Sequence, residues 1–72
     1  MENNICLKFG KHLRSLRKKH NLTQDQLAEK SGISTKYLQN LEGKNPKKAS
    51  IVTLEKLAKG FSIPLSKILE IK

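Results

Sequence analysis

The polar residues between Ser34 and Glu42 could recognise a ligand by hydrogen bonding. If this segment is a helix, Leu38 and Leu41 define its buried side, and four polar side chains project opposite or beside them. They are Thr35, Lys36, Gln39 and Asn40. In the major groove of DNA, lysine hydrogen-bonds guanine, the amides hydrogen-bond adenine and the threonine methyl group contacts thymine. An ordinary surface helix also turns polar residues outward, so the interpretation depends on the neighbouring elements.

Two closely spaced helices are predicted around these side chains. Thr23 is a typical helix N-cap, and Gln26 three residues later completes a capping box. Gly32 can adopt the left-handed conformation that ends a helix, and Ser34 caps the next helix almost at once. Because a link of about three residues cannot return the chain antiparallel, the two helices must cross steeply. This pattern predicts a helix-turn-helix over residues 23–42.

Three further helices are predicted before and after this pair. An apolar stripe at four-, four- and three-residue steps predicts a helix over residues 4–19. The stripe consists of Ile5, Phe9, Leu13 and Leu16. Ser50 caps a fourth helix, and Pro64 suits the first turn of a short fifth helix. We expect the fourth helix to bury Leu54, Leu57 and Ala58, and the fifth helix to contain Leu65, Ile68 and Leu69. Residues 1–72 are therefore expected to form one all-α, five-helix domain.

The charge balance points to a polyanionic partner. Fifteen Lys and Arg residues oppose six Asp and Glu residues, for a net charge of +9. An excess of this size in a short chain is typical of nucleic-acid binding. A membrane-active cationic peptide is a remote alternative, because the chain has no Trp and only two Phe for an apolar face. The sequence shows neither a membrane-spanning run nor a signal peptide, so we expect a cytoplasmic protein.

The residues that usually carry catalysis or bind metals form no recognisable set. The single cysteine, Cys6, excludes an internal disulfide, and Cys6, His12 and His20 lack the spacing of a zinc site. We expect Cys6 to be a buried or half-buried apolar residue and both histidines to face solvent. No nucleophile, base and acid occur in a suitable combination. The protein is expected not to be an enzyme and to need no cofactor, metal or small-molecule ligand.

The sequence resembles the Cro/repressor-type (Xre-like) helix-turn-helix family. The resemblance rests on TQDQLAEKSGIS at residues 23–34 and YLQNLE at residues 37–42, and extends over residues 9–69. It implies a lambda-repressor-like fold and a sequence-specific DNA-binding regulator of transcription. Two departures stand out: Gly43 follows Glu42 directly, where the family often has one residue between them, and Pro64 replaces a usual capping residue. The path of the loop 43–49 and the start of the last helix therefore stay open.

The resemblance also implies roles for individual residues. Gln24 would touch the DNA backbone, where the positive end of a helix attracts phosphate. Arg17 and Glu42 would form a structural ion pair. The further residues expected at the DNA are Ser34, Thr35, Lys36, Tyr37, Gln39 and Asn40. A basic loop after the recognition helix adds Lys44, Lys47 and Lys48 as expected phosphate contacts.

One small domain reads few base pairs, so we expect a homodimer on a pseudo-palindromic operator. The candidate dimer interface is the apolar C-terminal stretch of Leu65, Ile68, Leu69 and Ile71. Within this class, a restriction-modification controller and a phage-type repressor are both plausible. An antitoxin, which binds a toxin protein and represses its own operon, is the alternative from a different functional class. These residues do not determine the operator sequence, or whether the protein activates or represses transcription.

Overall fold

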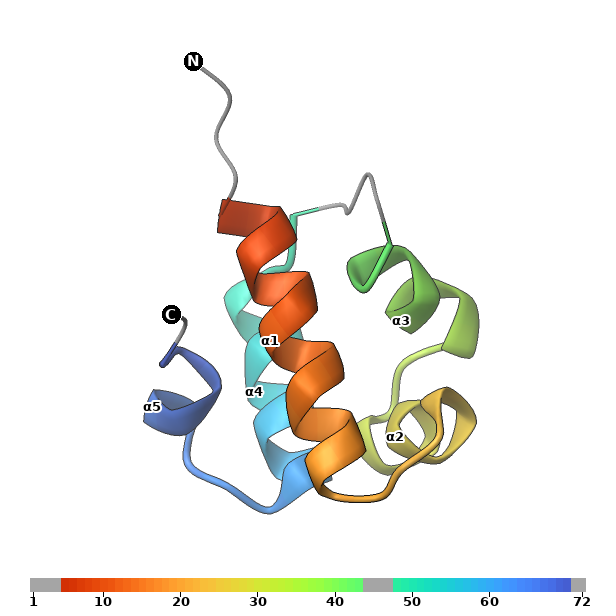
Figure 1. Cartoon of the computed structure of the whole chain (residues 1–72). Coiled ribbons are helices and arrows are strands. Elements are labelled where there is room, and N and C mark those ends of the chain that lie inside the picture. The colour runs from red at the N-terminus through yellow and green to blue at the C-terminus, as the bar shows by residue number, and fades with distance from the viewer. Residues whose placement is uncertain (1–4, 44–47, 71–72) are drawn as a thin grey trace.

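The computed structural model describes residues 5–43 and 48–70. Within these two ranges the chain forms five helices and no strand, as expected (Figure 1). They are α1 (Ile5–Lys19), α2 (Gln24–Ser31), α3 (Thr35–Leu41), α4 (Ile51–Phe61) and α5 (Leu65–Ile68). None of these helices is long and apolar enough to cross a membrane.

The ends of the helices follow from the local sequence. The Thr23 hydroxyl accepts a hydrogen bond from the backbone N–H of Gln26, whose side chain accepts one from the backbone of Thr23, so the predicted capping box is present. Gly32, at φ 73°, ends α2 in the left-handed conformation that glycine tolerates best. Ser34 caps α3 and Ser50 caps α4, as predicted. Only residues 32–34 therefore separate α2 from α3.

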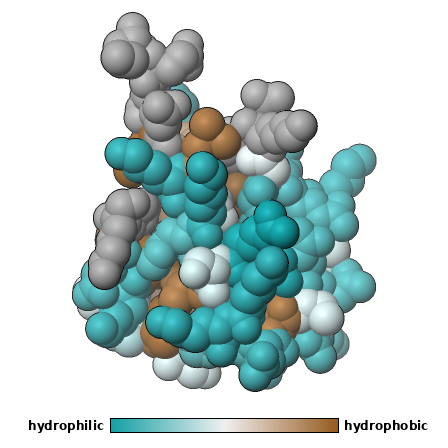
Figure 2. All heavy atoms as spheres, in the orientation of Figure 1, coloured by the Kyte–Doolittle hydropathy of each residue, from teal (hydrophilic) through white to brown (hydrophobic). Residues whose placement is uncertain are grey.

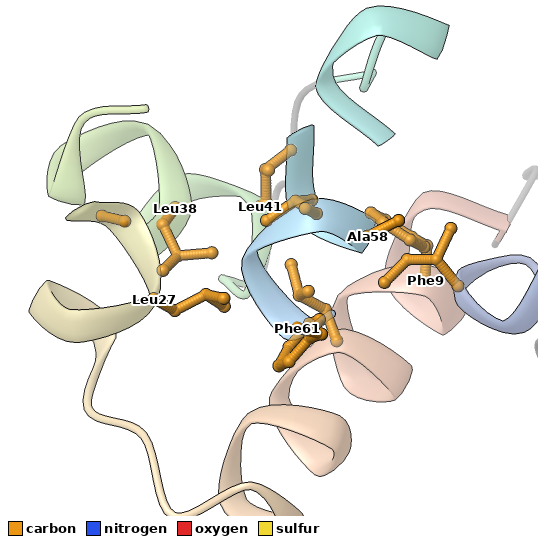
Figure 3. Close-up of a cluster of buried hydrophobic side chains, with 10 residues drawn as sticks. Phe9, Leu27, Leu38, Leu41, Ala58 and Phe61 are labelled. Carbon is orange, nitrogen blue, oxygen red and sulfur yellow. The ribbon is translucent and has the colours of Figure 1, made fainter. Parts of the chain in front are cut away.

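The core is a cluster of leucines completed by two aromatic rings (Figure 3). The fully buried large side chains are Leu13, Leu27, Leu38, Leu41, Leu57 and Ile68. Phe9 and Phe61 add further apolar surface to this cluster. All five helices contribute to it, and α2 packs mainly against α4. In Figure 1, α3 and α5 lie on opposite sides of the bundle.

Three expectations from the sequence need correction. Ile5 is 47% exposed, because it begins α1 before the core starts. His12 is half-buried, and its Nε2 is shielded from solvent. Pro64 stands one residue before α5 as its N-cap and makes no side-chain cap.

The predicted dimer surface also needs correction. Ile68 is fully buried in the core of its own chain, so it is not on the surface. Leu65 is half-buried against the same core, while Leu69 is 46% exposed. Ile71 lies outside the described residues. Some of the apolar residues that were expected to form an uncovered patch instead form the inward side of this short helix.

Gly10 allows α1 to cross the end of α3 at close range. A Cβ atom there would overlap the carbonyl oxygen of Leu41 and lie 3.5 Å from the Cα of Glu42. Both are backbone atoms, which cannot rotate away as a side-chain terminus can. The ~1 kcal/mol that alanine normally gains over glycine in a helix is therefore outweighed here.

We expect Gly10→Ala to lower the free energy of unfolding by about 1–3 kcal/mol, the usual cost of overpacking. Chemical denaturation followed by circular dichroism measures the change. Ser15→Ala is the matched control, because Ser15 is exposed on the same helix and its replacement meets no obstacle. If both variants are equally stabilised, the close approach does not restrict position 10.

Candidate nucleic-acid interface

The outward side of α3 carries the residues singled out in the sequence. Ser34 accepts a hydrogen bond from the backbone N–H of Tyr37 at 3.0 Å, which fixes the start of the helix. Leu38 and Leu41 hold the opposite side in the core. A depression of about 500 Å³ is lined by Ser34, Lys36, Tyr37, Gln39 and Asn40. Five of the six predicted residues of this segment thus share one surface, and Thr35 is half-buried at the start of the helix.

A second depression, of about 390 Å³, continues from this surface toward α1 and α2. Gln39 lines both depressions, so the two adjoin at this residue of α3. The second one also contains Gln24, at the start of α2, and Arg14 from α1. Arg14 was missed in the sequence because it belongs to a helix outside the helix-turn-helix. Its position three residues before Arg17 was the available signal, since this spacing places two residues on one side of a helix.

A buried ion pair closes the base of the second depression. Arg17 donates from Nε to Glu42 Oε2 at 2.9 Å and from Nη2 to Glu42 Oε1 at 3.1 Å. The side chain of Glu42 is only 4% exposed, and that of Arg17 is 13% exposed. The ion pair implied by the family resemblance is therefore present, and it joins α1 to the end of α3.

Two further hydrogen bonds extend this pair into α2 and the preceding turn. Arg17 Nη1 donates to the carbonyl oxygen of Leu22 at 3.0 Å. Gln24 Nε2 donates to Glu42 Oε1 at 3.1 Å. Since one amide hydrogen bond orients the whole carboxamide, Glu42 positions the Gln24 side chain at the start of α2. Arg17 of α1, Gln24 of α2 and Glu42 at the end of α3 are therefore held in one network.

Tyr37 connects the outward side of α3 to the start of α4. Its hydroxyl lies 3.4 Å from Thr53 Oγ1, which in turn lies 3.1 Å from Ser50 Oγ. Thr53 is buried, and Ser50 caps α4 by accepting from the Thr53 N–H. The ring of Tyr37 packs against the core, so this residue has a structural contact in addition to its place in the depression.

The basic loop after α3 is only partly described. Lys48 is exposed, whereas Lys44 and Lys47 lie outside the described residues. Across the described residues, no group of three or more His, Cys, Asp or Glu side chains gathers in a way that could hold a metal ion.

We expect alanine at either Arg17 or Glu42 to lower the free energy of unfolding by about 3 kcal/mol, because the partner is left buried without compensation. The double variant should lose less than the sum of the two single losses, and denaturant titrations of all four proteins measure this coupling. The exposed pair of Lys67 and Glu70, at 3.7 Å, is the matched control and should show coupling below about 1 kcal/mol. Purely additive losses at Arg17 and Glu42 would contradict the interpretation.

Comparison with known proteins agrees with this geometry. A family model described as helix-turn-helix matches residues 13–68. The control protein C.MunI from Mycoplasma sp is 34% identical over 67 residues, which cover 92% of this chain and 89% of that protein. The immunity repressor protein of Bacillus phage phi105 is 39% identical over 59 residues, or 82% of this chain. This match spans only 40% of the repressor's length.

Solved structures of similar proteins have the same fold. The restriction-modification controller C.AhdI from Aeromonas hydrophila superposes with a TM-score of 0.86 at 31% identity, over 93% of this chain and 100% of that one. The controller C.Esp1396I bound to a 19 base pair DNA duplex superposes with a TM-score of 0.85 at 25% identity, over 94% and 89% of the two chains. The chain therefore belongs to the helix-turn-helix family of DNA-binding regulators.

Proposed function

We propose that this protein regulates transcription by placing α3 in the major groove of a pseudo-palindromic operator, as a dimer. The observation that carries this proposal is the adjoining pair of depressions, which gathers amide, hydroxyl and ammonium groups along the outward side of α3. These groups can donate and accept hydrogen bonds at base edges, which present donors and acceptors in a fixed pattern. The buried network of Arg17 and Glu42 supports the role by holding α3 relative to α1 and α2.

Backbone phosphates would be bound beside the base contacts. Gln24 begins α2, where unpaired N–H groups and the positive end of the helix dipole favour an anion. Arg14 lines the same depression and supplies a full positive charge. Lys48 is exposed after the loop, and Lys44 and Lys47 remain sequence-based expectations. These contacts would set the orientation of the protein on the duplex, while α3 reads the sequence.

A restriction-modification controller is the subclass that the comparisons favour. The likeness to C.AhdI and C.MunI extends over nearly the whole of those proteins. A phage-type repressor is the second candidate, because the phi105 immunity repressor has the higher sequence identity. Both candidates share the proposed mechanism, and identification of the genes under control separates them.

We expect Lys36→Ala to weaken binding to the operator by about 1–3 kcal/mol and to relax the preference at one base pair. The operator is first selected from a pool of random duplexes, and affinity is then measured on the selected and on random DNA. Lys56→Ala is the control, because it makes the same substitution at an exposed position of α4 outside the depressions. If Lys36→Ala weakens both DNAs by the same factor, Lys36 contacts only phosphate.

The proposed dimer surface is revised to exposed apolar residues of α4 and its neighbour α5. Leu69 is retained from the sequence-based expectation, while Ile51 and Val52 at the start of α4 are 64% and 56% exposed. Large apolar residues exposed to this extent favour a protein contact. A two-fold contact is self-complementary, so it closes as a dimer and presents two copies of α3 to successive grooves.

We expect Val52→Glu and Leu69→Glu to shift the protein from dimer to monomer in sedimentation velocity at micromolar concentration, with an unchanged helical circular dichroism spectrum. Ile68→Glu should instead unfold the chain, because it places a carboxylate in the core. Lys59→Glu introduces the same side chain at an exposed position of α4 and serves as the control. A wild-type monomer that fills the complete operator alone would overturn the dimer proposal.

A further inference from the structure

A groove of about 780 Å³ lies between α1 and the segment that contains α5. It is on the side of the bundle away from α3 (Figure 1). The rim carries four lysines, and two half-buried apolar residues contribute to the floor. The rim lysines are Lys8, Lys11, Lys19 and Lys67, and the floor residues are Leu16 and Ile63. Figure 2 shows hydrophobic surface between α1 and α5 with hydrophilic side chains around it.

The positive charge on this rim is largely uncompensated. Lys8, Lys11 and Lys19 form no ion pair with any residue in the described parts of the chain. Lys67 lies 3.7 Å from Glu70, but both side chains are about 60% exposed, so water screens this pair strongly. The three α1 lysines extend over residues 8–19, eleven steps along the helix or about 16 Å at the rise of an α-helix. They form a line of charge along the groove.

His12 adds a polar group without a partner. Its Nε2 is shielded from solvent and has no hydrogen-bond partner among the described residues, although the side chain contributes to the groove wall. A buried polar atom in this condition costs free energy in the fold, and because Nε2 is shielded, His12 offers the groove its ring surface rather than this atom. The groove therefore combines a line of cations with an apolar floor.

This combination fits an acidic peptide better than nucleic acid. A phosphate backbone has charge but no apolar groups with which to cover Leu16 and Ile63. The two depressions of the proposed DNA surface share no lining residue with the groove, although α1 contributes Arg14 to one of them and Lys11 to the groove. The residues proposed for the dimer, Leu69, Ile51 and Val52, do not line the groove either. A partner bound here would leave both of those surfaces free.

We propose that the α1–α5 groove docks an acidic amphipathic helix of a partner protein. Carboxylates at three- and four-residue steps on that helix would face the lysines of α1, since this spacing repeats once per turn on both helices. Apolar residues on its adjacent side would cover Leu16 and Ile63, as in other complexes where a helix occupies a groove. The site is separate from α3, so the groove proposal can be tested independently of DNA recognition.

The test uses the full chain and a synthetic, fluorescein-labelled helical peptide with glutamates and leucines at three- and four-residue steps. Two control peptides replace every glutamate by glutamine or every leucine by serine. Fluorescence anisotropy measures affinity, and amide chemical shifts of the isotope-labelled protein locate the site. The expected result is binding of the first peptide alone, with shifts centred on Lys11, His12 and Leu16.

Lys11→Glu should weaken this binding about fivefold, as expected for the loss of one exposed charge pair. Lys56→Glu makes the same charge change at an exposed, mid-helix position of α4 and should change affinity less than twofold. Equal weakening by both variants, or binding of the serine peptide as tightly as the leucine peptide, would reduce the effect to general charge attraction and overturn the proposal.

Two further outcomes would also overturn the proposal. A random DNA duplex that shifts the amides of the groove rather than those of α3 would make the groove a nucleic-acid surface. A peptide that dissociates the dimer would show that a second copy of the chain occupies the groove. Loss of operator binding in Lys36→Ala with unchanged peptide binding separates this inference from the proposed function.

Discussion

The buried ion pair between Arg17 and Glu42 is the constraint on which the arrangement of the DNA-binding elements depends. Glu42 follows the last residue of α3, Arg17 belongs to α1, and the same carboxylate accepts from Gln24 at the start of α2. Desolvating two charges offsets much of their attraction, so such a pair contributes more to geometry than to net stability. Here the geometry is the relative position of three helices.

The close approach at Gly10 joins the same two elements as that ion pair. Without a side chain at this position, α1 can lie against the backbone of Leu41 and Glu42, and about two turns further along α1 Arg17 binds the Glu42 carboxylate. The helix-turn-helix is often considered as α2 and α3 alone. In this protein α1 also supplies Arg14 to the depression beside α3, so the proposed DNA surface comes from three helices.

Two surfaces of the molecule each carry part of the large positive charge. Part of it lies with α3 and the depression that contains Arg14, and part lines the α1–α5 groove. Net charge draws any polyanion to a protein from a distance, but it does not select the surface that binds. Selection depends on the groups among the cations. Amides and hydroxyls accompany the charge on α3, while apolar residues accompany it in the groove.

The sequence by itself determined the helices and their ends. Thr23, Ser34 and Ser50 cap helices through contacts with residues three positions away, so they can be identified without a structure. The outward side of α3 also followed from local spacing, because Leu38 and Leu41 define its buried side. The family resemblance supplied the ion pair of Arg17 and Glu42, whose partners are far apart along the chain.

Only the tertiary structure decided which residues of different helices share a surface. Ile68 lies near the end of the chain and was expected on the surface. It is buried, because α5 packs against the core. His12 was expected in solvent, yet its Nε2 is enclosed beside the α1–α5 groove. Arg14 joins Gln24 and Gln39 only once α1 packs across α3. Periodicity assigns a side chain to one side of its own helix, whereas burial and contact depend on which helix packs there.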